Sequence, residues 1–258
     1  MEEDVVQVTE LLARRLDLLE VVSAGPTSKR TLVSDLDVSR STVDRAVRSL
    51  ESAGIVHRRD GAVTLTTTGE IALRGYRDFH RGLIGLRDAS PLFRSVDPDS
   101  LPPFSLFVDA TVVTAKRESP HQPIRAFEQF LEDAERIQTV WTGLIPDYVD
   151  FYNEQVVDRG MEADLFVRSS VLDDLLSAYW EPIARAVQTG RLTLYEVSDD
   201  PPLSIKVAET GVPEVGILTY GSQGISGFIR SDDVEGVEWA KSLLDSVRGD
   251  AVRVAPLE

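Results

Sequence analysis

The stretch from Leu36 to Val56, LDVSRSTVDRAVRSLESAGIV, decides the fold of the first part of this chain. Its apolar residues recur every three or four positions, which is typical of one face of a helix. These residues are Val43, Ala46, Val47, Leu50 and Ala53. Ser39 stands where an N-cap belongs and Gly54 where a C-terminal stop belongs, so we expect a helix of about four turns from Arg40 to Ala53.

The other face of this helix is polar and mainly basic. It carries Arg40, Ser41, Asp44, Arg45 and Arg48. A helix with a short polar N-terminus, three arginines on its solvent face and a compact apolar back fits the major groove of DNA. An ordinary amphipathic surface helix has the same periodicity, so the flanking segments must distinguish the two interpretations.

The preceding segments predict two more helices. Val5 to Ala24 is rich in leucine and valine and ends at Gly25-Pro26, which indicates a scaffold helix. Thr27 to Leu36 is a second, short helix, with Ser28 as a plausible cap. Asp37-Val38 then leads directly into the basic helix, and two short helices joined by so few residues predict a helix-turn-helix.

The following segment predicts a β-hairpin. Apolar residues alternate on both sides of Asp60-Gly61, and glycine adopts the positive φ of a two-residue turn without steric cost. Helix, turn, helix and hairpin form the order of a winged helix. Arg58 and Arg59 lie near the tip of the hairpin, where a wing reaches the minor groove or the phosphates.

A further helix is expected from Thr67 to Arg87. Its apolar residues have the spacing of a coiled-coil seam, and they are Ala72, Tyr76, Phe79, Leu83 and Leu86. A linker helix that packs on its own domain is the alternative. We favour dimerisation, because two-fold dimers that read palindromes are usual among helix-turn-helix proteins.

The pattern changes after a Pro-, Asp- and Ser-rich linker. We therefore expect a DNA-binding domain over residues 1–88, a linker over 89–103 and a second domain over 104–258. The second domain should alternate strands (107–115, 136–141, 161–167, 192–197) with helices (123–134, 146–159, 170–189), followed by strands 204–209, 215–220 and 225–230 and a helix over 233–248. This order predicts an α/β domain whose sheet is mixed, so the whole chain is of the α+β or α/β class.

Composition narrows the functional classes. The chain has no cysteine and only three histidines, so disulfides are excluded and a metal site is not expected. It has neither a signal peptide nor an apolar run long enough to cross a membrane, so we expect a soluble, cytoplasmic protein. Only four of its 27 basic residues are lysine and its net charge is −16, a composition similar to that of halophilic proteins.

The negative charge is unevenly distributed. The first 85 residues carry twelve basic and thirteen acidic residues, whereas the rest of the chain carries fifteen and thirty. Residues 27–62 carry seven basic and five acidic residues, so the predicted DNA-binding element is locally basic. The net negative charge of the whole chain nevertheless opposes contacts with DNA phosphates.

Two blocks of sequence resemble a known family when they occur in this order. The first is LLARRLDLLEVVSAGPTSKRTLVSDLDVSRSTVDRAVRSLESAGIVHRRDGAVTLTTTGEIAL; the second begins with VWTGLIPDYVDFYNEQVVDRGMEADLFVRSSVLDDLL and continues with QTGRLTLYEV and VGILTYGSQGISGFI. The chain resembles haloarchaeal winged-helix regulators whose C-terminal part is named for the middle domain of a methanogenesis regulatory protein. The resemblance implies a dimeric transcription regulator.

The C-terminal half is also similar, more distantly, to the phospholipase-D-like effector domain of archaeal sugar-sensing regulators. Catalytic members of that fold need a His-x-Lys motif followed five residues later by Asp. Here Ser204-Ile205-Lys206 is the nearest match, with Gly211 at the carboxylate position. The P-loop, GxGxxG, GxSxG and HExxH motifs are absent as well, so we expect no catalytic residues, no cofactor and no enzyme activity.

A ligand site in the second domain is a further hypothesis. Arg168, Lys206 and Arg230 are cations at or within predicted strands, and in open α/β sheets ligands bind beyond the carboxyl ends of strands. An anionic metabolite would suit them. The alternative is that they form surface ion pairs with the abundant carboxylates. Trp141 and Tyr148 could line the pocket, with Tyr152, Tyr179 and Trp180, although aromatic residues are more often part of a core.

The sequence thus predicts a homodimeric regulator that binds double-stranded DNA, with a C-terminal domain that senses a small ligand or mediates oligomerisation. Four residues would approach base edges: Arg40, Ser41, Thr42 and Arg45. The phosphates would be held by Ser28, Lys29, Arg30, Arg48, Arg58 and Arg59, and Ser39 belongs to the same surface. Two alternatives remain: a degenerate phosphodiesterase fused to a DNA-targeting domain, and a module in which the winged helix binds another protein.

Overall fold

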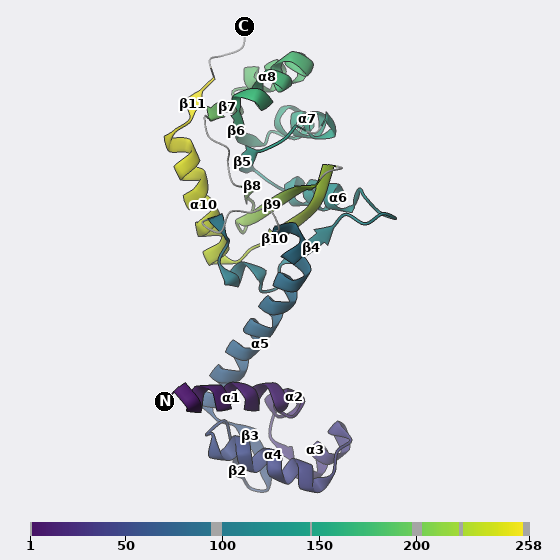
Figure 1. The fold of residues 1–258 in the computed structure, drawn as a ribbon, viewed down its shortest axis with the longest axis vertical. Helices are drawn as coiled ribbons and strands as arrows, with labels where there is room; N and C mark the ends of the chain where they lie inside the picture. Colours follow the sequence, from purple (N-terminus) through teal and green to yellow (C-terminus); the bar gives the residue numbers. More distant parts are fainter. Residues whose placement is uncertain (1, 94–99, 145, 198–202, 222–223, 255–258) are drawn as a thin grey trace. The chain divides into compact units, whose positions relative to one another are not determined.

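The computed structural model describes residues 2–93, 100–144, 146–197, 203–221 and 224–254 (Figure 1). The chain forms two compact units, Met1–His80 and Arg81–Glu258. The boundary falls within one helix, α5 (Thr67–Ala89), which therefore contributes residues to both units. Residues 94–99 of the predicted linker lie outside the described residues, whereas Leu92 is buried in the core of the second unit.

The first unit is a winged helix-turn-helix. Its elements are α1 (Glu2–Arg14), α2 (Leu16–Ser23), β1 (Thr27–Ser28), α3 (Lys29–Leu36), α4 (Arg40–Ser52), β2 (Val56–Arg59), β3 (Ala62–Leu65) and the start of α5. The helix predicted from Val5 to Ala24 is two helices, because Arg15 leaves the helical conformation with φ −120° and ψ 16°. The predicted helix from Thr27 begins two residues later, because Thr27 and Ser28 pair with β3.

Both ends of α4 are defined by local hydrogen bonds. The Ser39 side chain accepts a hydrogen bond from the Thr42 backbone N–H at 3.2 Å, as an N-cap does. At the other end Gly54 has φ 71° and its N–H donates to Glu51 O, while Ile55 N donates to Leu50 O at 2.9 Å. This pair of bonds is a Schellman motif, and it ends the helix one residue before the predicted end.

The wing is a tight hairpin of β2 and β3. Arg59 pairs with Ala62, which leaves Asp60 and Gly61 as the two turn residues, with φ 52° and 80°. Positive φ at both positions defines the type I′ turn that matches the twist of the strands. The hairpin and β1 form a three-stranded antiparallel sheet in the order β1-β3-β2, so the predicted wing is confirmed.

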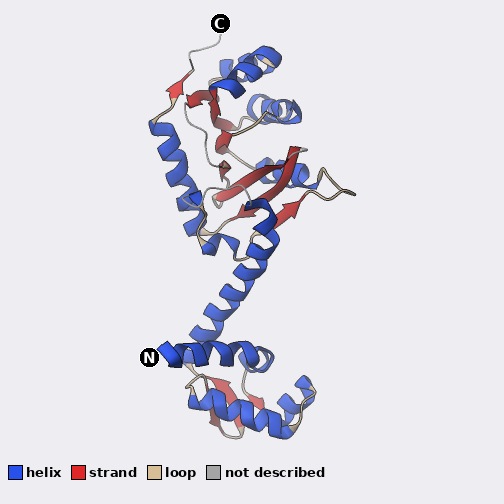
Figure 2. Ribbon diagram, viewed as in Figure 1, coloured by secondary structure: helices blue, strands red, loops and turns tan. Residues whose placement is uncertain are grey.

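The second unit contains an eight-stranded mixed sheet (Figure 2). Its strand order is β11-β7-β6-β5-β8-β9-β10-β4. The strands are β4 (Thr111–Thr114), β5 (Arg136–Trp141), β6 (Glu162–Arg168), β7 (Leu192–Val197), β8 (Ser204–Glu209), β9 (Glu214–Gly221), β10 (Gly224–Ser231) and β11 (Val252–Arg253). β5, β6 and β7 are parallel, and the other pairs are antiparallel, as the alternation of elements predicted.

Helices cover both faces of this sheet. One core packs α6 (Gln122–Leu131), α7 (Pro146–Asn153), α8 (Ser169–Ala178) and α9 (Trp180–Gln188) against one face. A separate core packs α10 (Val234–Gly249) and the 3-10 helix Phe104–Phe107 against the other face. In Figure 1 α10 lies along one side of the sheet, in yellow. No helix among the described residues is long and apolar enough to span a membrane.

Several predicted elements differ from the structure. The strand expected over 107–115 is only Thr111–Thr114, because Phe107 ends a 3-10 helix. The helix expected over 170–189 is broken at Tyr179, which has φ −132° and ψ 32°. The helix over 146–159 ends in a π-helical turn, Glu154–Asp158. Gly221 at the end of β9 pairs with Gly224 at the start of β10, and Ser222 and Gln223 lie outside the described residues.

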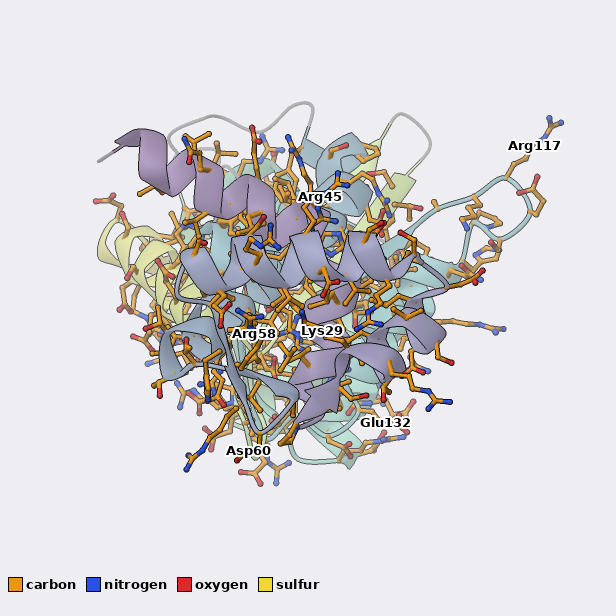
Figure 3. The ribbon with its side chains drawn as sticks, turned by 90° about the horizontal axis from the view of Figure 1, so that it is seen from below. Lys29, Arg45, Arg58, Asp60, Arg117 and Glu132 are labelled. Atoms are coloured by element: carbon orange, nitrogen blue, oxygen red, sulfur yellow. The ribbon has the colours of Figure 1, made fainter. Side chains whose placement is uncertain are left out.

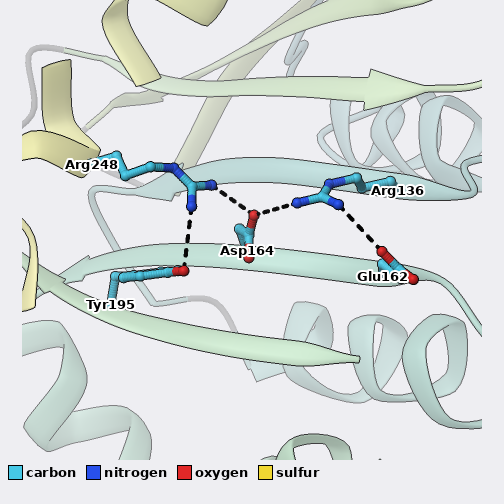
Figure 4. A network of polar contacts seen from close by, with 5 residues as sticks. All are labelled: Arg136, Glu162, Asp164, Tyr195 and Arg248. Carbon is cyan, nitrogen blue, oxygen red and sulfur yellow. Dashed lines mark hydrogen bonds and ion pairs between the residues drawn. The ribbon is translucent and has the colours of Figure 1, made fainter. Parts of the chain in front are cut away.

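A network of hydrogen bonds and ion pairs connects α10 to the sheet (Figure 4). Asp164 Oδ2 on β6 accepts hydrogen bonds from Arg248 at 2.7 Å and from Arg136 at 2.9 Å. Burial raises the pKa of this carboxyl, but the two guanidinium groups outweigh burial and the pKa is lowered. Arg248 also lies over the rings of Phe166 and Tyr195, so the network joins the end of α10 to β6 and β7.

Candidate nucleic-acid interface

The exposed face of α4 carries three arginines. Arg40, Arg45 and Arg48 are exposed, and within the described residues none of them forms an ion pair. Ser41 is exposed beside them and Thr42 is half-buried. The apolar back of the helix, which includes Val47 at 0% exposure, is buried in the core of the unit. The helix therefore presents guanidinium groups without ion-pair contacts to solvent, although Arg40 and Arg48 act over a longer distance on Asp44, whose pKa they help Lys29 to lower.

Two ion pairs lie along one side of α4. The Lys29 ammonium contacts Asp44 Oδ1 at 2.5 Å, and Arg58 binds Glu51 through Nη2–Oε2 at 2.5 Å and Nε–Oε1 at 3.1 Å. The hydrogen bond from each cation lowers the pKa of its carboxylate partner. Figure 3 shows Arg45 on one side of α4 and Lys29 and Arg58 on the other.

These ion pairs change the predicted roles of two residues. Sequence reasoning assigned Lys29 and Arg58 to phosphates, but in the structure each cation faces a carboxylate of α4. The two carboxylates are seven residues apart, or two helical turns, so they lie along one stripe of the helix. Asp44 thus ties α3 to α4, and Glu51 ties the wing to α4. A phosphate that approaches either cation must compete with that carboxylate.

The hydroxyls of Ser28 and Ser39 act as helix caps. Ser28 accepts from the Thr31 N–H at 3.1 Å, and Ser39 also bonds to the hydroxyls of Ser41 and Thr42. Both caps position the N-termini of α3 and α4. Arg30 and Arg59 are exposed, and Arg59 lies 3.8 Å from Asp60 at the tip of the wing.

Two arginines near this surface were missed from the sequence. Arg14 and Arg15 line an open groove of about 740 Å³ between α1 and α4, together with Arg48. Arg14 is engaged by Glu10 at 2.8 Å. The sequence contains these residues as an Arg-Arg pair. Because we predicted a single helix over residues 5–24, we did not expect the break at Arg15 or a position of the pair near α4.

The predicted seam of α5 is divided. Ala72 and Tyr76 pack against the core of the first unit, and Leu86 packs against a core of the second unit. Phe79 and Leu83 are 48% and 42% exposed. Three of the five residues therefore contribute to their own units, which is the alternative that periodicity left open, and two remain on the surface.

The three predicted ligand cations differ in their surroundings. Arg230 on β10 is paired with Glu214 at 2.7 Å and lies over the Phe130 ring, so the ion-pair alternative holds for it. Arg168 at the end of β6 donates to Thr142 O at 3.5 Å. Lys206 is instead buried on one face of the sheet, where it is 1% exposed, and its ammonium donates to the Ser204 hydroxyl at 2.9 Å.

The aromatic residues proposed for the same pocket are mostly core. Trp141, Tyr148 and Tyr152 are buried in the core beneath α6 and α7, Tyr179 packs against it half-buried, and Trp180 is 42% exposed. Within the part of the chain that the structure describes, no cluster of three or more His, Asp or Glu residues could hold a metal ion.

The chain was compared with curated proteins and with solved structures. Comparison with curated proteins gave no match. The solved structure of TrmBL2, an archaeal chromatin protein, is similar with a TM-score of 0.44 and 17% identity over 96% of this chain and 99% of that chain. NucT from Helicobacter pylori (TM-score 0.43, 9% identity) covers 57% of this chain and 99% of its own. Nuc, a phospholipase D family member from Salmonella typhimurium, has a TM-score of 0.42 and 10% identity over 57% and 97%.

Two family matches cover most of the sequence. Residues 3–84 match the HVO_A0261 N-terminal domain. Residues 120–250, just over half of the chain, match the middle domain of the methanogenesis regulatory protein FilR1, which confirms the resemblance carried by the second sequence block. The chain belongs to the family defined by the FilR1 middle domain.

Proposed function

We propose that this chain is a transcription regulator that binds double-stranded DNA sequence-specifically as a homodimer, and that its second domain senses a small ligand. The observation that carries the proposal is the exposed face of α4, where Arg40, Arg45 and Arg48 project without ion-pair partners among the described residues. A bidentate arginine reads guanine in the major groove, and the N-terminal residues of such a helix contact base edges.

Local charge supports this proposal. The chain is strongly acidic, yet Asp44 and Glu51 are turned to the flanks of α4, where Lys29 and Arg58 neutralise them. The exposed face therefore keeps its positive charge. At high salt the general attraction to phosphates is weak, so base contacts must supply more of the affinity.

Genome-wide binding tests the proposal in the cell. Chromatin immunoprecipitation of the full chain should recover discrete sites that share a two-fold motif, and deletion should change transcription of the adjacent genes. Recovery of DNA without a shared motif, or motif-bearing sites whose genes do not respond, would refute a sequence-specific regulator.

The two alternatives are less well supported. A phosphodiesterase of the phospholipase D type needs a histidine and a carboxylate where this chain has Ser204 and Gly211. Hydrolysis of a phosphodiester by the full chain, lost on Lys206→Met, would revive that alternative. A protein-interaction module would bind its partner but give no discrete sites on DNA, so the immunoprecipitation separates it from a regulator.

A further inference from the structure

A cluster of polar groups is buried in the second unit, on the sheet face covered by α6 and α7. Thr139 on β5 pairs directly with Lys206 on β8, so both side chains lie on the same face. Trp141 and Ser204 are two residues away on the same strands and share that face. Tyr152 reaches the cluster from α7. All five are at most 7% exposed.

Hydrogen-bond donors in this cluster exceed acceptors. The Lys206 ammonium has three donors, and the one hydrogen bond it makes to a described residue is to Ser204 Oγ. Ser204 in turn donates to the backbone carbonyl of Val140 at 3.0 Å. Trp141 Nε1 can only donate, and it makes no hydrogen bond within the described residues. The hydroxyls of Thr139 and Tyr152 make no hydrogen bond of good geometry there either. The Tyr152 hydroxyl nevertheless lies close enough to the Thr139 and Trp141 side chains for polar interactions with both to lower its pKa slightly against the larger effect of burial, so the group with most unused donors is the Lys206 ammonium.

Lys206 has no counter-charge. No described carboxylate lies within ion-pair distance of its ammonium, which instead lies 5.4 Å from the centre of the Phe127 ring. Arg230 belongs to the same row of strand partners, through Gly216 on β9, but Glu214 neutralises it. Titratable side chains in the core on the same face include the tyrosines Tyr148, Tyr152 and Tyr220. A buried cation of this kind is stable only when it is deprotonated or paired.

We propose that Lys206, Trp141, Thr139 and Tyr152 form a binding site for a small inorganic monoanion such as chloride. The side chains that share this face carry one positive charge, so a single negative charge balances the site, whereas a dianion would leave an excess negative charge in an apolar core. The burial of all four side chains limits the ligand to one or a few atoms. This inference deepens the proposed function, because it names a ligand class for the sensing domain.

Proton uptake accompanies anion binding. Burial lowers the pKa of Lys206 to about 7. Burial also raises the pKa of Tyr152 and Tyr220, so both stay neutral near pH 7. A bound anion favours the ammonium over the amine. The anion should therefore bind below pH 7 and be released as the pH rises and Lys206 loses its proton.

Thermal unfolding of the full chain tests this site without DNA. The melting temperature should be measured in sodium glutamate, chloride, bromide and phosphate at one ionic strength, at pH 6 and pH 9. At a chloride concentration one hundred times Kd, the melting temperature at pH 6 should rise by about 5–10 °C relative to glutamate. Bromide should replace chloride, and the rise should shrink at pH 9.

Variants locate the effect. Lys206→Met should abolish the chloride-dependent rise, whereas the matched control Lys241→Met, at a half-exposed lysine on α10 paired with Glu238, should keep it. Thr139→Val should weaken the response, which keeps the test informative if Lys206→Met alters folding. In crystals grown with bromide, an anomalous peak should lie within hydrogen-bond distance of Lys206 Nζ.

Three outcomes would overturn the proposal. They are an unchanged melting temperature in chloride, an equal response from Lys206→Met, and a Lys206-dependent response to phosphate but not to halides. The DNA-binding proposal does not depend on this result, because the measurement contains no DNA and α4 is unchanged.

Discussion

The burial of Lys206 does not follow from the residues next to it in the sequence. Lys206 is completely buried, whereas Lys29 is half-exposed and Lys116 is exposed. The sequence predicts that Lys206 lies in a strand. Side chains alternate between the two faces of a sheet, and this alternation does not tell which face becomes enclosed. Burial on that face depends on α6 and α7, which lie elsewhere in the sequence and pack across it. The sequence therefore predicted a candidate cation but not an enclosed one.

The depressed pKa of Lys206 makes stability depend on pH. Its pKa falls from 10.5 to about 7 on folding, so between these values the unfolded chain binds a proton that the folded chain does not. The free energy of unfolding must then rise with pH in this window. In a chloride-free buffer, urea unfolding should show stability rising between pH 7 and pH 9, by at most about 1.4 kcal/mol per pH unit.

Lys206→Met provides the comparison for this pH dependence. The variant lacks the titrating amine, so its advantage in stability over wild type should be largest near pH 6 and should shrink toward pH 9. If the two proteins had parallel pH profiles, Lys206 would not titrate in this window.

At the scale of single elements, the parts set by neighbours in sequence were predicted well. Ser39 and Gly54 bound α4 because caps depend on hydrogen bonds within a few residues. Asp60-Gly61 gave the wing for the same reason. The breaks at Arg15 and Tyr179 were missed, because each interrupts a continuous apolar pattern and depends on how the two half-helices pack on their neighbours.

The interface was predicted only in part. The exposed arginines of α4 follow from helical periodicity. The pairing of Lys29 with Asp44 spans 15 residues and links different helices, so no local rule predicts it. Asp44 appeared in the sequence merely as a member of the polar face, and the structure shows that it holds α3.

The Glu51–Arg58 pair leads to a test of the wing. Glu51→Gln should free Arg58 for a phosphate, so affinity for DNA should rise and the slope of log K against log salt should steepen by about 0.9. Stability should change little, because exposed ion pairs contribute about 0–1 kcal/mol. Fluorescence anisotropy with a labelled duplex over a salt series measures both quantities.

Glu70→Gln is the matched control for this test. It removes the same charge from the same unit at an exposed position of α5. If Glu51→Gln and Glu70→Gln changed affinity and slope equally, the effect would be one of net charge and Arg58 would have no phosphate to contact.

At the scale of the whole molecule, we expect the proposed homodimer to form through the exposed part of α5. Phe79 and Leu83 are spaced four residues apart and remain on the surface, as residues of a short dimer seam would. Leu83→Glu should place a charge in such a seam and give monomers by sedimentation equilibrium. Affinity for a palindromic site should then fall more than affinity for a single half-site.

Ile71→Glu is the control for dimerisation. Ile71 lies on the same helix and is 67% exposed, but it is outside the proposed seam, so this variant should remain dimeric. A dimeric Leu83→Glu protein would exclude α5 as the interface.

The charge of the whole molecule opposes DNA binding, and this makes specificity the decisive quantity. The excess of acid lies in the second part of the chain, whereas residues 27–62 carry more base than acid. General attraction to phosphates is therefore limited, and the contribution of α4 should appear mainly in discrimination between sequences.

The most direct measurement is the ratio of affinities for a selected operator and for random DNA, compared between Arg45→Ala and Arg74→Ala at the salt level of the cell. Arg74 is an exposed arginine of the same unit outside α4 and the wing. Arg45→Ala should reduce this ratio, with a loss of about 1–3 kcal/mol in the free energy of discrimination, and should relax the preference at one base pair. Arg74→Ala should leave the ratio unchanged. An unchanged ratio for Arg45→Ala, or an equal loss for both variants, would contradict sequence reading by α4.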